Sequence, residues 1–182
     1  MPVAGGGFEQ CYNAQAGVDT DTMLVVATTL TAAANDQQQV APMLQVLTAL
    51  PQDVGTVTQL LADAGYLSAA NVDTCIAANI EPLIAAGRES HHLPWQERFT
   101  EPAPLPDAAD VDALTQMKQR LKTLAGRALY GLRKQTVETV FGILKAVLGF
   151  RQFLLRGLDN VRAEWALVTM AWNIRRMAVL KG

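Results

Sequence analysis

The chain has 182 residues, half of them hydrophobic, so it can bury a substantial core, and we expect a single domain over residues 1–182. The lack of an apolar run of about 18 residues excludes a transmembrane helix. The N-terminus also lacks the basic and then apolar order of a secretion signal, so we expect a cytoplasmic protein without membrane contact. Cys11 and Cys75 have no zinc-ligand spacing, which fits a reducing compartment.

The formal net charge of -2 conceals an uneven distribution of charge. Residues 1–110 carry 13 acidic and two basic side chains, and residues 111–182 carry 13 basic and four acidic ones, which gives -11 followed by +9. A basic segment of this kind is expected for a protein that binds a polyanion, most commonly nucleic acid. The alternative is that the two regions pack together and neutralise each other.

The first 50 residues predict a β-hairpin followed by a helix. Runs rich in Val and Thr at residues 11–19 and 23–31 are typical of strands, and the polar link between them indicates a hairpin. Asn35 is then placed to cap a helix whose apolar residues recur at helical spacing and which ends before Pro51.

The stretch 57–66 predicts a buried strand whose apolar run ends at Asp63. In open α/β sheets the carboxyl ends of strands are where ligands and catalytic groups collect. The ordinary alternative is that Asp63 only forms a turn or caps a helix. A helix over residues 68–78 and a short strand over residues 81–84 follow.

Residues 86–110 contain four prolines and no periodicity, and we expect an exposed insertion or linker. The adjacent His91 and His92 have no further metal ligands at a suitable spacing, which favours a solvated loop. A helix over residues 110–124 is expected next, followed by a break at Gly126.

A helix over residues 130–145 carries a carboxylate between basic side chains. At about 100° per residue, Lys134, Glu138 and Lys145 share one face. A neighbouring apolar stripe is expected to dock this helix, and Gly149 to end it. The ordinary reading is a surface ladder of ion pairs, worth a few tenths of a kcal/mol. The stripe consists of Val137, Val140, Leu144 and Val147.

The chain ends in a predicted helix of about 20 residues that begins near Asp159. It is apolar most of the way round, so we expect it to pack between two surfaces or to meet a partner. One apolar line holds Val161, Trp165, Val168 and Trp172, and the other holds Leu167, Met170, Ile174 and Met177.

Four motifs occur in an order that resembles the catalytic half of bacterial insertion-sequence transposases of the DDE type. The resemblance covers nearly the whole chain and implies an α/β fold with a ribonuclease H-like core, in which a mixed sheet is flanked by helices and followed by a helical C-terminal portion. The motifs are Tyr12-Asn-Ala-Gln-Ala-Gly-Val-Asp19, Asn35-Asp36, Ala62-Asp63-Ala-Gly-Tyr66 and Tyr130-x2-Arg133-Lys-x2-Val-Glu138-x2-Phe-Gly-x2-Lys145.

The resemblance implies roles for individual residues. Asp63 matches the second acidic residue of the family and Glu138 the third. A Tyr-Arg-Glu-Lys signature supplies basic groups that are expected to contact DNA phosphates. Four residues separate Arg133 from Glu138 where the general signature has three, so Lys134 is an alternative to Arg133. The DNA-binding set implied in this way is Tyr130, Arg133, Lys134, Lys145, Arg151 and Arg156.

Carboxylates of this family hold two divalent ions, usually Mg²⁺, on either side of a phosphodiester. The resemblance therefore implies Asp63 and Glu138 as metal ligands, and Mg²⁺ needs no Cys or His because it prefers oxygen ligands. The family's first Asp lies on a strand upstream of the segment that begins at Tyr12, so we expect this chain to lack both. Its possible replacements are Asp19, Asp21 and Asp36.

The resemblance thus implies a C-terminal fragment of a DDE DNA transposase that binds DNA and is catalytically incomplete. The alternative is a non-catalytic remnant that binds DNA, or that pairs with itself as a homodimer or with a full-length transposase. A third possibility is that a chain without its first strand does not fold stably alone, because unpaired sheet edges remain exposed.

Overall fold

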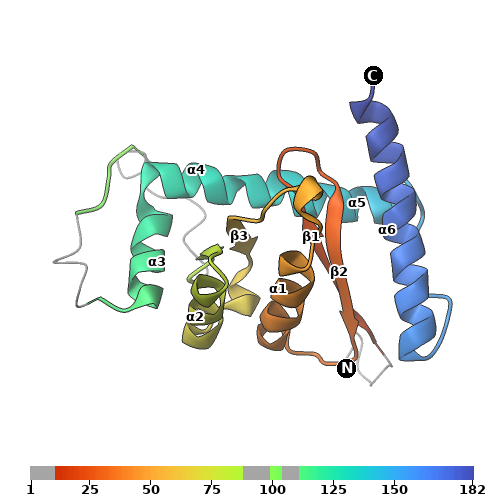
Figure 1. Cartoon of the computed structure of the whole chain (residues 1–182), viewed down its shortest axis with the longest axis horizontal. Helices are drawn as coiled ribbons and strands as arrows, with labels where there is room; N and C mark the ends of the chain where they lie inside the picture. Colours follow the sequence, from red (N-terminus) through yellow and green to blue (C-terminus); the bar gives the residue numbers. More distant parts are fainter. Residues whose placement is uncertain (1–10, 88–98, 104–110) are drawn as a thin grey trace. The chain divides into compact units, whose positions relative to one another are not determined.

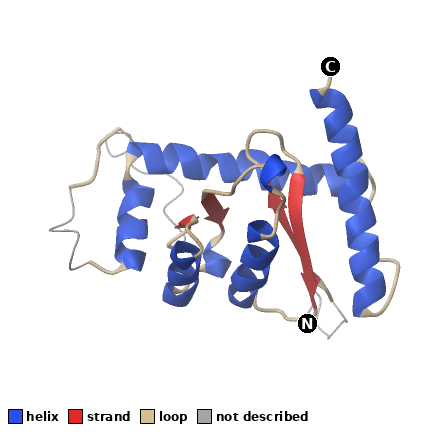
Figure 2. Cartoon of the chain, viewed as in Figure 1, coloured by secondary structure: helices blue, strands red, loops and turns tan. Residues whose placement is uncertain are grey.

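A computed structural model describes residues 11–87, 99–103 and 111–182. The described residues form two compact units, the first from the residues up to Leu47 together with Lys134–Gly182, and the second from Thr48–Arg133. Each unit combines a two-stranded sheet with helices (Figure 2), so the α/β class expected from the sequence is confirmed. The described strands form two separate sheets, where a single mixed sheet was expected.

The first unit contains the predicted hairpin. Strands β1 (Asn13–Val18) and β2 (Val25–Thr31) pair antiparallel, with a register shift at Gly17/Val18. Asp19 holds the turn, because its carboxylate accepts hydrogen bonds from the backbone N–H and the hydroxyl of Thr22 at 2.8 and 2.5 Å.

Helices of the first unit follow the predicted order. The side chain of Asn35 accepts a hydrogen bond from the N–H of Gln37, so Asn35 is the expected cap. It precedes η1 (Asp36–Gln39) and α1 (Val40–Thr48), and the C-terminal part of the unit contains the π-helical segment η5 (Lys134–Glu138), α5 (Thr139–Ala146) and α6 (Leu158–Leu180).

Helix α6 lies alongside β2 (Figure 1) and satisfies backbone groups of the hairpin with its own side chains. The amide of Asn173 both donates to the carbonyl oxygen of Val25 and accepts from its N–H, each at 2.8 Å, as a paired strand residue would. The indole of Trp165 donates to Gln15. The core beneath this contact consists of Val25, Leu30, Val140, Leu144, Val161, Trp165 and Trp172.

The second unit is built on a β-α-β arrangement. Strands β3 (Gln59–Ala62) and β4 (Glu81–Ile84) are parallel and are joined through α2 (Ala69–Ala77), in the strand-helix-strand order predicted for residues 57–84, although β3 is only partly buried where a buried strand was expected. Cys75 on α2 is completely buried, and burial raises the pKa of its thiol to about 11, so it is a core residue with little thiolate at neutral pH.

Two further helices complete the second unit, α3 (Ala113–Lys122) and α4 (Leu124–Arg133). Asp112 caps α3, and hydrogen bonds from the hydroxyl and the N–H of Thr115 hold the pKa of Asp112 below its usual value. The predicted break at Gly126 is wrong, since the break falls at Thr123 and Gly126 lies inside α4.

The segment 99–103 is in contact with these helices. The carboxylate of Glu101 accepts from the N–H of Leu124 at 3.1 Å, and the carbonyl of Thr100 accepts from the guanidinium of Arg127 at 3.2 Å. This part of the expected linker therefore caps the start of α4. His91, His92 and the rest of residues 88–98 and 104–110 lie outside the described residues.

Among the described residues, no helix has both the length and the apolar composition needed to cross a membrane.

Candidate functional site

Asp63 lies immediately after β3, at the carboxyl end of the strand, as the sequence predicts. Its backbone is extended and its side chain makes no capping hydrogen bond to the short helix η3 (Ala64–Tyr66) that follows. Asp63 therefore occupies the N-cap position of η3 and its carbonyl accepts from the N–H of Tyr66, as the ordinary reading expects, but its carboxylate is not used as the cap. Its side chain is 57% exposed, which leaves carboxylate oxygen accessible for other partners.

Tyr130 and Arg133 of α4 converge on Asp63. The guanidinium of Arg133 contacts the Asp63 carboxylate at 3.0 Å, and its carbon lies 5.7 Å from the centre of the Tyr130 ring. The Tyr130 hydroxyl donates to the carbonyl of Ala62, at 3.3 Å. Arg133 is only 12% exposed whereas Asp63 is 57% exposed, so solvent screens the ion pair on the side of Asp63. Two motifs separated by about 70 residues thus meet at one strand end.

Lys134 and Glu138 lie at the two ends of the π-helical segment η5, in the other unit, and both are exposed. The shared face predicted for Lys134, Glu138 and Lys145 assumes a uniform α-helix, and this assumption is wrong. A π-helical turn closes from residue i to i+5 and so changes the rotation between the residues before and after it. Glu138 directly precedes α5, which carries Lys145 near its C-terminal end.

The apolar stripe predicted for this helix is partly confirmed. Val140 and Leu144 are buried, with exposures of 0% and 1%, whereas Val147 is 58% exposed because α5 already ends at Ala146. Thr136, inside the π-helical segment, is buried in addition.

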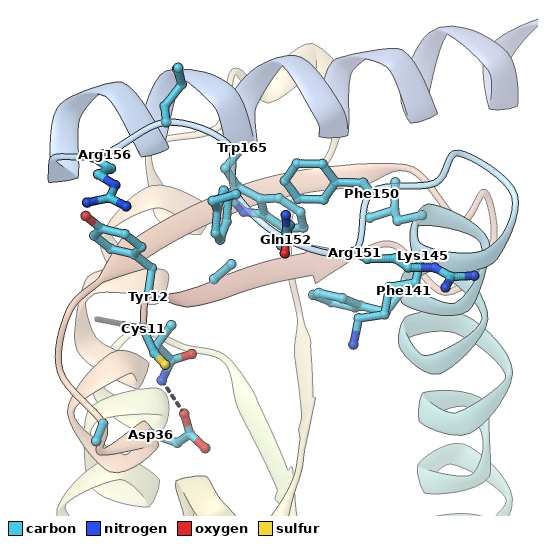
Figure 3. A pocket seen from close by; sticks show the side chains of 16 residues that line it. Cys11, Tyr12, Asp36, Phe141, Lys145, Phe150, Arg151, Gln152, Arg156 and Trp165 are labelled. Carbon is cyan, nitrogen blue, oxygen red and sulfur yellow. Dashed lines mark hydrogen bonds between the residues drawn. The ribbon is translucent and has the colours of Figure 1, made fainter. Parts of the chain in front are cut away.

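Lys145, Arg151 and Arg156 line a cavity of about 960 Å³ in the first unit. Figure 3 shows Arg156 beside Tyr12, with Lys145 and Arg151 on the opposite side of the cavity near Phe141. The amine of Lys145 lies 6.0 Å from the centre of the Phe141 ring. The structure therefore brings three of the predicted DNA-binding residues into one cavity.

The aromatic lining of this cavity is not evident from the sequence pattern. The hydroxyl of Tyr12 accepts from the N–H of Gly157 at 3.1 Å, so it holds the loop that carries Arg151 and Arg156. Tyr12 is the first residue of the first motif, and this position was the sequence signal that could have indicated its role at the cavity. The other rings at the cavity are Phe141, Phe150, Phe153 and Trp165.

The possible replacements for the first acidic residue differ in their surroundings. Asp36 accepts from the amides of Asn13 at 2.7 Å and Gln15 at 3.3 Å, and the carboxylate of Asp19 is occupied by the hairpin turn. Asp21 is exposed in that turn. Among the described residues there is no cluster of three or more His, Cys, Asp and Glu side chains that could hold a metal ion.

A family model described as a transposase DDE domain matches residues 3–174. Because this match covers most of the chain, the chain belongs to the DDE transposase family, and the resemblance seen in its motifs is confirmed. This membership makes DNA its partner and associates it with DNA transposition, and the family generally uses divalent metal ions. No curated protein and no solved structure matches the chain.

The chemistry of the site residues fits such an ion. Asp63 and Glu138 are both accessible carboxylates, the donor type that hard divalent cations prefer. Arg133 contacts one oxygen of Asp63, Oδ2. Arg133 thus supplies positive charge at the Asp63 carboxylate.

Proposed function

We propose that the chain is part of the catalytic domain of a DDE DNA transposase with a ribonuclease H-like core, and that Asp63 and Glu138 are two of the three acidic ligands of its metal site. The convergence of Asp63, Tyr130 and Arg133 at the end of β3 carries this proposal. The family match extends across both compact units, which supports one catalytic-type domain over residues 1–182, with 86–110 as an insertion. We place the protein in the cytoplasm.

In this proposal Asp63 and Glu138 hold Mg²⁺. Such ions, when bound, activate the attacking oxygen and stabilise the leaving oxygen of a phosphodiester. Arg133 orients the carboxylate of Asp63, and Tyr130 anchors α4 to the last residue of β3 through Ala62. These contacts keep Asp63 at the strand end before a metal ion arrives.

The remaining cations of the predicted set bind DNA phosphates. Lys145, Arg151 and Arg156 line one cavity together with Asp36, and the excess of positive charge there favours an anionic partner such as DNA. Phosphate contacts of this kind position a nucleic acid without reading its sequence.

We further propose that the chain by itself is catalytically incomplete, because none of the candidate carboxylates suits the role of the third acidic ligand. The side chains of Asp19 and Asp36 have structural hydrogen-bond partners, and Asp21 lies in the same turn as Asp19. None of these three is therefore assigned as the third acidic ligand.

The metal site can be tested by measuring Mn²⁺ binding to the full chain by electron paramagnetic resonance. We expect Asp63→Asn and Glu138→Gln each to weaken binding about tenfold or more, because each removes a charged oxygen ligand. Asp21→Asn is the matched control, since Asp21 is an exposed carboxylate that the proposal leaves out, and it should leave binding unchanged. Equal binding by all three variants and the parent chain would contradict the proposal.

Catalytic incompleteness needs a separate measurement. The purified chain should show little or no Mg²⁺-dependent cleavage or strand transfer on plasmid DNA. Robust cleavage that disappears in Asp63→Ala and Glu138→Ala would show that the chain supplies its own third ligand.

A non-catalytic DNA-binding role is the second candidate, and the cationic cavity favours it because that cavity includes neither Asp63 nor Glu138. DNA binding that is unaffected by divalent ions and by Asp63→Asn, together with absent Mn²⁺ binding, would favour this role. The same remnant could pair with a full-length transposase.

A further inference from the structure

The outer edge of β2 lacks a partner over part of its length. Among the described residues β2 pairs with one strand, β1, so alternate residues of β2 direct their N–H and C=O groups away from β1. At Val25 the amide of Asn173 binds these groups. Within the described part of the chain, no side chain binds the backbone of residues 28–31 in this way. This part of the edge can therefore accept a further strand.

A groove of about 680 Å³ follows the same part of β2. Side chains of consecutive strand residues point to opposite faces of a sheet. Because residues 28–31 all line the groove, it lies at the edge of the strand and not on one face. Its walls come from η1 and α1 and from α6, and they include Gln38, Gln39, Pro42, Gln45, Val46, Arg162, Trp165 and Ala166.

Gln39 contributes an unused amide to this groove. Its side chain lines the groove although the residue is only 6% exposed, and none of the hydrogen bonds between described residues involves its amide. Burial of an amide without a partner costs free energy. An amide both donates and accepts, as the peptide group does. Asn173 already pairs in this manner with the backbone of Val25, so Gln39 is suited to pair with a second backbone.

The groove is almost uncharged. Arg162 is the one ionisable residue among those that line it, and its guanidinium is paired with Asp159 at 3.0 Å. The other polar groups are neutral amides and hydroxyls. The groove therefore differs from the cationic cavity around Lys145, and it favours an uncharged ligand over DNA.

We propose that this groove binds an uncharged, extended peptide segment of a partner protein, which pairs with residues 28–31 as an added strand. The backbone of the segment completes the edge of β2 and pairs with the amide of Gln39. The helical walls beside the edge admit a single extended segment, whereas the edge of another folded sheet would collide with them. The occupant is therefore a flexible segment and not a second folded copy of the chain.

Gln39→Leu separates this role from a structural one. Leucine is similar in size but has no polar group, so the variant should raise the midpoint of urea unfolding, because no hydrogen bond is lost. It should also weaken peptide binding about tenfold. Gln135→Leu is the matched control, since Gln135 is exposed and does not line the groove, and it should leave peptide binding unchanged. A lower midpoint for Gln39→Leu would assign Gln39 a structural role and overturn the proposal.

The probe for binding is the acetylated and amidated peptide Thr-Val-Thr-Val-Thr, because its β-branched residues favour an extended backbone. In nuclear magnetic resonance titrations of the full chain, we expect the peptide to shift the backbone amides of β2 and the side-chain amide of Gln39. It should also slow hydrogen exchange at residues 28–31. The absence of saturable shifts in the groove would overturn the proposal.

Two N-methylated forms of the peptide test whether it pairs as a strand. Only alternate residues of an added strand direct their N–H groups toward β2. Methylation of the second and fourth residues and methylation of the first, third and fifth should therefore differ, with one form losing about tenfold in affinity and the other binding normally. Equal effects of the two forms would contradict strand pairing. These outcomes do not depend on metal or DNA binding, so this inference and the proposed function can fail separately.

Discussion

At the scale of single residues, Asp63 and Arg133 form an ion pair although about 70 positions separate them in the chain. The sequence motifs imply different roles for the two residues, metal binding for Asp63 and contact with DNA phosphates for Arg133. The structure shows them in contact at 3.0 Å. The Asp63 carboxylate thus supplies the negative partner of the largely buried guanidinium, since a buried charge without a partner is costly.

The role of Gly126 becomes clear only from the packing of α4 against the end of α3. A glycine in a helical pattern suggests a break, yet Gly126 lies inside α4, where an added Cβ would fall 1.9 Å from the carbonyl oxygen of Arg120. The close approach of α4 to the end of α3 therefore requires the missing side chain.

Gly126→Ala should accordingly destabilise the protein by about 1 to 3 kcal/mol, the usual cost of overpacking a rigid neighbour. Gly131→Ala on the same helix is the matched control, because nothing lies within 4 Å of its added Cβ. Its better helix propensity should stabilise the chain by up to about 1 kcal/mol. Urea denaturation measures both values, and equal effects of the two substitutions would contradict the steric explanation.

At the scale of elements, the π-helical segment η5 explains the irregular spacing in the last motif. One residue more than expected lies between Arg133 and Glu138, and the structure contains a π-helical turn over Lys134–Glu138. A π-helical turn takes up one extra residue within a helical run, and such turns occur frequently at functional sites. The extra residue of the motif therefore corresponds to the π-helical turn in the structure.

Deletion of the exposed Gln135 should therefore be tolerated, with a change of about 1 kcal/mol or less, because the segment can then revert to α-helical hydrogen bonding. Deletion of Gly142, which is exposed in α5, should cost about 2 to 5 kcal/mol, because it rotates Leu144 out of the core. Denaturant unfolding compares the two. A similar loss of stability from both deletions would show that η5 does not accommodate an extra residue.

At the scale of the whole molecule, the uneven distribution of charge leads to a prediction about DNA binding. The C-terminal region carries most of the cations, and three of them meet at one cavity. If these three contact phosphates, each releases about 0.9 counterions from duplex DNA on binding.

Replacement of Lys145, Arg151 and Arg156 by Gln should then reduce the slope of log K against log salt concentration by about 2 to 3. Arg162→Gln is the control, because Arg162 is exposed but already paired with Asp159, and it should leave the slope nearly unchanged. Gel-shift titrations on duplexes of unrelated sequence measure both. An unaltered slope in the triple variant would place the phosphate contacts elsewhere.

Much of the fold was predictable because its signals are local. The hairpin, the cap at Asn35, strand β4 and the position of Asp63 at a strand end all follow from propensity and turn chemistry within a few residues. The break after α3 and the π-helical turn were not predictable, since helical periodicity looks the same across a one-residue irregularity.

The sequence by itself determined the family, through the order of its motifs, and it identified the residues that carry charge at the candidate site. Only the tertiary structure decided which of these residues meet. It joined Asp63 to Arg133, gathered Lys145, Arg151 and Arg156 at one cavity, and buried one apolar line of α6 while leaving the other exposed. The type and charge of each side chain can be read directly from the sequence. Which side chains meet and which are buried depends on contacts between residues far apart in the chain, and periodicity alone does not encode these contacts.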